Sequence, residues 1–78
     1  MTFEEFQATG RVVADLSTVP EIAAQIDTVG PGRVYVDGLF IAGVPHAYCI
    51  TIGDDSRITS LEEAERLLYE FAQSEGYV

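Results

Sequence analysis

Hydrophobic residues in the opening segment recur at the spacing of a helix. The stripe that they form consists of Phe3, Phe6, Gly10 and Val13. Thr2 and Glu5 stand in the spacing of a capping box, in which the hydroxyl and the carboxylate each bond a free backbone N–H of the helix start. The pattern predicts a first helix that begins here and continues through Val13. Because glycine weakens a helix, we expect Gly10 to mark either a weak point or a close packing contact.

A second helix is predicted to begin near residue 18. Thr18 and Glu21 repeat the capping-box spacing, and Pro20 falls in the first turn, where its missing N–H costs little. The apolar residues that then recur at helical spacing are Val19, Ile22, Ala23, Ile26 and Val29. Residues 30–32, Gly-Pro-Gly, predict a firm end to this helix, because proline cannot continue the hydrogen-bond ladder.

From residue 33 to residue 59 the period changes from 3.6 to two, and β-branched and aromatic residues predict an antiparallel meander. Asp37-Gly38 separates two apolar triplets, residues 34–36 and 39–41, and is compatible with a hairpin turn or with a bulge in one long strand. We favour the bulge. Residues 43–45 and 53–56 predict turns that flank a strand over 46–52 and precede a short strand over 57–59.

Alternation along the strand over 46–52 divides its side chains between two faces. One face carries Tyr48, Ile50 and Ile52 and is predicted to be core. The other face carries Ala47, Cys49 and Thr51, which are small or mildly polar. We therefore expect helices to cover one side of the sheet and to leave the Cys49 side partly open.

The last predicted helix begins at Ser60, which stands in capping-box spacing with Glu63, and ends near Gly76. Its apolar stripe consists of Leu61, Ala64, Leu68, Phe71 and Ala72. The residues predicted to point away from the core are Glu62, Glu63, Arg66 and Glu70, with Tyr69 beside them. The whole pattern predicts a single α+β domain of two helices, three or four antiparallel strands and a C-terminal amphipathic helix.

Charge adds a strong constraint. The 78 residues include 13 Asp and Glu against four Arg and no Lys, a formal net charge of −9, while 47% are hydrophobic. That apolar content is typical of a folded domain, so the carboxylates must cover its surface and attract positively charged partners. Nucleic acid and anionic membranes are polyanions that favour Lys and Arg, and we expect neither to bind directly.

Few residues offer catalytic or metal-binding chemistry. Cys49 is the sole cysteine, the N-terminus lacks the pattern of a signal peptide, and no apolar run approaches a membrane span, so we expect a cytoplasmic protein. His46 and Cys49 are three apart on a strand and so face opposite sides, which does not suit a shared zinc ion. Asp54-Asp55 lacks the spacing of an EF-hand loop. We expect no cofactor, no metal and no enzymatic activity.

Two surfaces are candidates for binding. The first is the outer face of the last helix, where Glu62, Glu63, Arg66, Tyr69 and Glu70 would meet an Arg/Lys-rich groove on another protein, such as a nucleic-acid-binding complex. The blander alternative is that this acidity only provides solubility.

The second candidate surface is the open sheet face. It would pair with a second copy around Tyr35, Phe40 and Cys49, in a structural or regulatory dimer. A third possibility is that the chain is an acidic, antitoxin-like partner of a basic toxin.

Three segments carry a resemblance to other proteins. Thr51-Ile52-Gly53, the run from Leu67 to Tyr77 and Phe3-Glu4-Glu5-Phe6 resemble segments of short uncharacterised bacterial proteins, some of them carried on mobile elements. In size and acidity the chain also resembles, as a class, the phage-encoded anti-CRISPR and anti-restriction proteins. That second resemblance implies an inhibitor that occupies a basic nucleic-acid-binding surface, and it assigns no functional residues.

Overall fold

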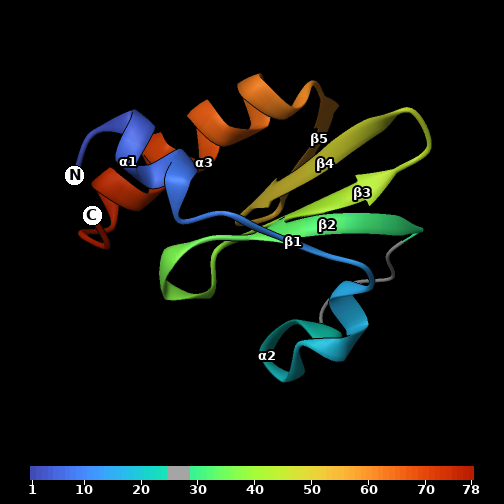
Figure 1. The fold of residues 1–78 in the computed structure, drawn as a ribbon. Coiled ribbons are helices and arrows are strands. Elements are labelled where there is room, and N and C mark those ends of the chain that lie inside the picture. The colour runs from blue at the N-terminus through green and yellow to red at the C-terminus, as the bar shows by residue number, and fades with distance from the viewer. Residues whose placement is uncertain (25–28) are drawn as a thin grey trace.

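The computed structural model describes residues 1–24 and 29–78, and its centre is a five-stranded antiparallel sheet. The strands follow one another in the order β1 (Arg11–Val13), β2 (Gly30–Val34), β3 (Phe40–Val44), β4 (Ala47–Ile52) and β5 (Asp55–Thr59). Helices α1 (Phe3–Ala8) and α3 (Leu61–Ser74) lie on one side of the sheet, and α2 (Pro20–Ala23) lies on the other (Figure 1). The α+β class is confirmed, but the sheet has more strands than the three or four predicted.

The additional strand is β1, which replaces the second half of the predicted first helix. Helix α1 begins at the predicted capping box, where the Thr2 hydroxyl accepts from Glu5 N and the Glu5 carboxylate accepts from Thr2 N. It ends at Ala8, because Arg11 and Val13 pair with Val34 and with Gly32 of β2. The β-branched residues Val12 and Val13 are stabilised more by pairing with β2 than by continuing the helix that their spacing predicts.

The second predicted helix is shorter than expected. A 3-10 turn, η1 (Leu16–Thr18), precedes α2, and Pro20 occupies the first turn of α2 as predicted. Thr18 does not cap α2, because its hydroxyl donates to the carbonyl of Asp15 and the N-cap position is Val19. Ile26, which was predicted to continue the stripe, lies outside the described residues.

The Gly-Pro-Gly segment at 30–32 is part of strand β2 and does not end a helix. Here the backbones approach so closely that only glycine fits. A Cβ on Gly32 would lie 2.6 Å from the carbonyl oxygen of Ile41, and one on Gly43 would lie 1.7 Å from the carbonyl oxygen of Pro31. Pairing between β2 and β3 is also irregular between Gly30 and Arg33, which accommodates the proline.

Asp37-Gly38 forms the turn between β2 and β3, so the predicted bulge is wrong. Both residues have left-handed backbone, with φ of 59° at Asp37 and 74° at Gly38, the conformation of the turns that best suit a hairpin. The remaining turns are shorter than expected. Pro45-His46 joins β3 to β4, and Gly53-Asp54 joins β4 to β5, so β5 begins two residues before the predicted strand.

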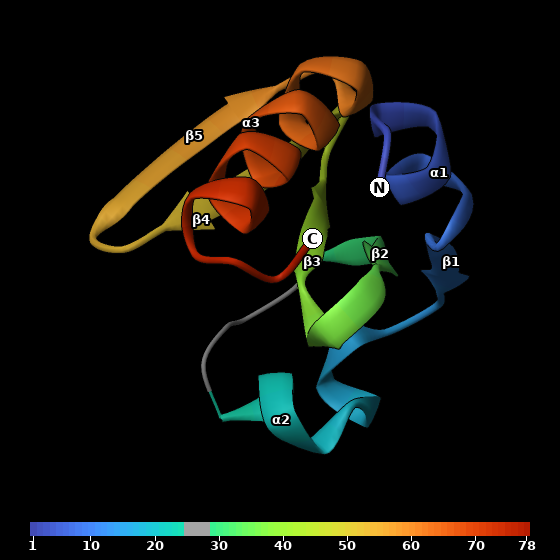
Figure 2. The same cartoon turned by 90° about the vertical axis from the view of Figure 1, so that its left-hand side faces the viewer.

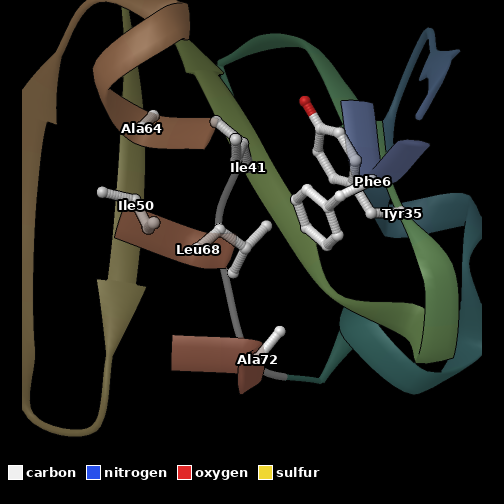
Figure 3. Close-up of a cluster of buried hydrophobic side chains, with 7 residues drawn as sticks. All are labelled: Phe6, Tyr35, Ile41, Ile50, Ala64, Leu68 and Ala72. Carbon is white, nitrogen blue, oxygen red and sulfur yellow. The ribbon is translucent and has the colours of Figure 1, made fainter. Parts of the chain in front are cut away.

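The face of β4 predicted to be core is confirmed. Ile50 is buried, and Tyr48 and Ile52 pack at the edge of the same cluster. The buried members of this main core are Phe6, Tyr35, Ile41, Ile50, Ala64, Leu68 and Ala72 (Figure 3). Gly10 lies against it, since a Cβ there would be 2.6 Å from the Tyr35 ring, so the expectation of a close packing contact is confirmed.

The opposite face of the sheet has a smaller core of its own, in contrast to the expectation that helices cover one side. Leu16 of η1 and Ile22 of α2 pack against Val34 and Ala42, with Phe40 and Cys49 partly buried beside them. Toward β5 this face is open, because Ile58, the cross-strand partner of Cys49, is 67% exposed.

Helix α3 follows its prediction closely. The Ser60 hydroxyl accepts from Glu63 N at the start, and Gly76, with a φ of 78°, lies just beyond the end. Leu68 and Ala72 are buried against the sheet, and α1 lies beside the helix on the same side (Figure 2). The helical layer is thus built from segments about sixty residues apart in the sequence, Phe3–Ala8 and Leu61–Ser74.

Replacing Gly43 by Ala should strongly destabilise the fold, because the new methyl group would overlap the Pro31 carbonyl. We expect a loss of at least about 3 kcal/mol in the free energy of unfolding, measured by urea denaturation. Gly53→Ala is the control, since its only cost is a φ of 61° in open space, about 1 kcal/mol. Equal losses in the two variants would contradict the close approach of β2 and β3.

Candidate functional site

The acidic surface predicted on the last helix is present on α3. We call it the α3 acidic face and define it as Glu62, Glu63, Arg66, Tyr69 and Glu70. Its four charged side chains are exposed, whereas Tyr69 is half-buried. The helical spacing therefore brings all five predicted residues together on one surface.

Two of the three glutamates on this face have ion pairs. Glu62 lies 3.6 Å from Arg66, and Glu63 lies 3.7 Å from Arg57 of β5. All four of these side chains are more than half exposed, so the pairs contribute little stability and leave their carboxylates accessible. Within residues 1–24 and 29–78, Glu70 has no ion pair.

A groove of about 190 Å³ lies between α1 and α3 on this face. Its lining consists of Phe3, Arg66, Tyr69, Glu70 and Gln73. The rings of Phe3 and Tyr69 meet at a tilt of 60° with their centroids 5.6 Å apart. The Tyr69 hydroxyl donates to the carbonyl of Met1 and accepts from Gln73 Nε2, so this aromatic ring is held by its own helix and by the N-terminal residue that precedes α1.

Sequence reasoning did not include Phe3 and Gln73 in the site. Phe3 is on the predicted stripe of its own helix, but nothing in the sequence showed that α1 would pack beside α3. Gln73 stands four residues after Tyr69, on the same side of the helix, so helical spacing alone could have found it.

A buried polar cluster lies beneath the acidic face. Glu65 is 6% exposed, and its two carboxylate oxygens accept from the Tyr35 hydroxyl at 2.7 Å and from Gln7 Nε2 at 3.0 Å. The cluster joins α1, the residue that follows β2 and α3. Burial, together with the hydrogen bond to Glu65, raises the pKa of Tyr35, so this hydroxyl remains a donor.

The burial of Glu65 was also missed, although the sequence carried its signal. Glu65 stands four residues after Leu61 and three before Leu68, within the apolar stripe of α3. A carboxylate at such a position must be buried and hydrogen-bonded, or it must disturb the packing.

The three residues predicted for a dimer surface do not lie on one exposed face. Tyr35 is 3% exposed and lies in the main core, stacked on Phe6 with ring centroids 5.0 Å apart. Phe40 and Cys49 lie on the opposite face, partly buried by η1 and α2. Tyr35 and Phe40 both line a cavity of about 630 Å³, and Cys49 is not part of that lining.

The described ranges contain no group of three or more His, Cys, Asp or Glu side chains arranged to hold a metal ion. None of the helices described is long and apolar enough to cross a membrane. The α3 acidic face offers carboxylates and aromatic surface, groups that bind cationic side chains.

Comparisons of the chain with protein-family models, with curated proteins and with solved structures find no match. The function is therefore inferred from the chain's own residues.

Removing the Tyr35 hydroxyl should destabilise the protein, because Tyr35→Phe leaves one oxygen of the buried Glu65 carboxylate without its donor. We expect a loss of about 1–3 kcal/mol in the free energy of unfolding, measured by urea denaturation. Tyr77→Phe is the matched control at an exposed tyrosine and should change stability by less than about 0.5 kcal/mol. Similar values for the two variants would show that the buried hydrogen bond contributes nothing.

The raised pKa of Tyr35 also predicts a pH dependence. Above the ordinary tyrosine pKa of 10.0 the unfolded chain loses this proton while the folded chain retains it, so stability is fully present below that pH and falls as the pH rises. Between about pH 9 and about pH 11, unfolding measurements should show wild type losing about 1 kcal/mol more than Tyr35→Phe. Parallel losses would mean that Tyr35 titrates normally.

Proposed function

We propose that the protein is a non-enzymatic binding protein whose α3 acidic face docks on an Arg/Lys-rich surface of another protein. The partner best suited to this chemistry is a nucleic-acid-binding protein, whose basic groove the acidic face would occupy in place of phosphates. That mode of action is the one implied by the class-level resemblance to phage anti-CRISPR and anti-restriction proteins.

The distribution of charge on the helical layer supports the proposal. Glu4 and Glu5 of α1 are exposed on the same layer as the three glutamates of the α3 acidic face. In the helices that the structure describes, Arg66 is the only basic residue. Exposed carboxylates on a chain with a net charge of −9 raise the rate of encounter with a basic partner.

One observation favours a binding surface over a surface that only confers solubility. Glu70 has no ion pair in the described part of the chain and lies at a groove beside the ring of Tyr69. A carboxylate next to a fixed aromatic ring can bind a cationic side chain both by charge and by contact, and tyrosine and arginine are common at the centres of interfaces. Solubility alone requires no such groove.

Self-association through Tyr35, Phe40 and Cys49 is a weaker candidate, because Tyr35 is buried in the main core. An antitoxin-like role would use the same acidic face against a basic toxin, and it differs from the main proposal only in the identity of the partner.

The experiment begins with capture of partners from the native cell at low salt, followed by affinity measurements with the purified partner. Glu62→Lys/Glu70→Lys should weaken binding about tenfold or more. The matched control, Asp54→Lys/Asp55→Lys at the β4–β5 turn, also changes the net charge from −9 to −5 and should change affinity by less than about threefold.

The two variants separate the alternatives because their net charges are equal. Equal weakening would mean that only total charge matters, and unchanged affinity in the α3 variant would show that this face is not the binding surface. If the α3 variant loses only solubility and no specific partner is captured, the acidic coat acts against aggregation alone.

A further inference from the structure

Arg66 occupies an unusual position on the α3 acidic face. Its guanidinium carbon lies 4.6 Å from the centroid of the Phe3 ring, and its Nη2 lies 3.6 Å from the Glu62 carboxylate. Within one chain, the guanidinium group of Arg66 therefore already contacts an aromatic ring of the groove and the carboxylate of Glu62, which is outside the groove lining.

The remaining wall of the groove offers a second set of the same groups. Tyr69 supplies an aromatic ring, and Glu70 supplies a carboxylate that has no ion pair within the described ranges. Glu70 also stands four residues after Arg66, one helical turn away, so Arg66 has an alternative carboxylate within reach if it leaves the Phe3 ring.

We propose that this groove is a subsite for one arginine side chain of the partner, and that Arg66 covers the Phe3 ring of the subsite in the free protein. A partner arginine takes the Phe3 face and the Glu62 carboxylate, and Arg66 turns toward Glu70. This inference rests on the proposed function, because it names the side chain that the acidic face recognises.

Arginine fits the groove better than lysine for a geometric reason. The guanidinium group is planar, so it lies flat on an aromatic ring and can present two N–H groups to a carboxylate. The lysine ammonium is a compact, strongly hydrated charge that gains less from the ring. A surface that attracted cations by charge alone would not distinguish the two.

An internal occupant lowers the affinity for an external one, because the bound form must first release Arg66. Removing Arg66 should therefore strengthen the binding of arginine. Arg11→Gln provides the matched control, since it changes the net charge by the same amount as Arg66→Gln. Arg11 is exposed on β1, where it pairs with Val34 on the opposite side of the sheet from the groove.

The test uses two capped pentapeptides, Gly-Gly-Arg-Gly-Gly and Gly-Gly-Lys-Gly-Gly, titrated at low salt and followed by NMR chemical shifts. With wild type, the arginine peptide should bind about three- to fivefold more tightly than the lysine peptide, with the largest shifts at Phe3 and at the Gln73 side-chain amide. Arg66→Gln should bind the arginine peptide about threefold more tightly than Arg11→Gln does.

Phe3→Leu keeps an apolar side chain but removes the ring, and it should abolish the preference for arginine. Thermal unfolding checks that this variant is folded. If it is not folded, the comparison of Arg66→Gln with Arg11→Gln tests the proposal by itself. The proposal is overturned if the peptides bind equally to wild type, if the shifts centre elsewhere, or if Arg66→Gln matches Arg11→Gln. Those outcomes leave the proposed function standing, because it depends on the affinity of the purified partner for the charge-reversed variants.

Discussion

The hydrogen-bonded cluster around Glu65 is the constraint on which the helical layer depends. Glu65 accepts from Tyr35, which follows β2, and from Gln7 of α1, so a single buried carboxylate fixes the sheet and both helices relative to one another. A buried charge without its donors is far more costly than a buried apolar group, which makes this arrangement specific. The stacking of Phe6 on Tyr35 places an apolar contact next to the same cluster. The position of α1 beside α3, and hence the groove between them, follows from these contacts.

The same feature divides the acidic residues into two kinds. Glu65 is structural, since both of its oxygens are used inside the protein. Glu62 and Glu63 are exposed and have ion pairs that solvent weakens, and Glu70 is exposed with no ion pair in the part of the chain that the structure describes. The net charge of the chain counts all of these glutamates equally, whether they are buried or exposed. Of the four glutamates on α3, only these last three are exposed to solvent, and they share the helix with the aromatic ring of Tyr69.

How far the sequence predicts the structure depends on how strongly local signals agree. Helix α3 was predicted almost completely, because Ser60, a regular apolar stripe and Gly76 all indicate the same element. Strand β1 was missed, because Val13 continues a helical spacing and only its pairing with Gly32 reveals a strand. The Gly-Pro-Gly segment was misread for a similar reason: the close approach of Gly43 to Pro31 is a tertiary fact with no local signal. For the site, the helical spacing of a single segment was enough to predict the acidic face. The part played by Phe3 could not be predicted, because it depends on how two helices distant in the sequence pack together.

The chain's single cysteine has a practical consequence. Cys49 is partly buried at the margin of the smaller core, where η1 and α2 pack on the sheet, and its side chain lies on the opposite face of the sheet from α3. The rate at which a thiol reagent modifies the native protein would therefore report how often that margin opens, without any engineered probe. Because the groove between α1 and α3 lies on the other side of the sheet, the same reagent could follow local opening while the groove is occupied by a peptide.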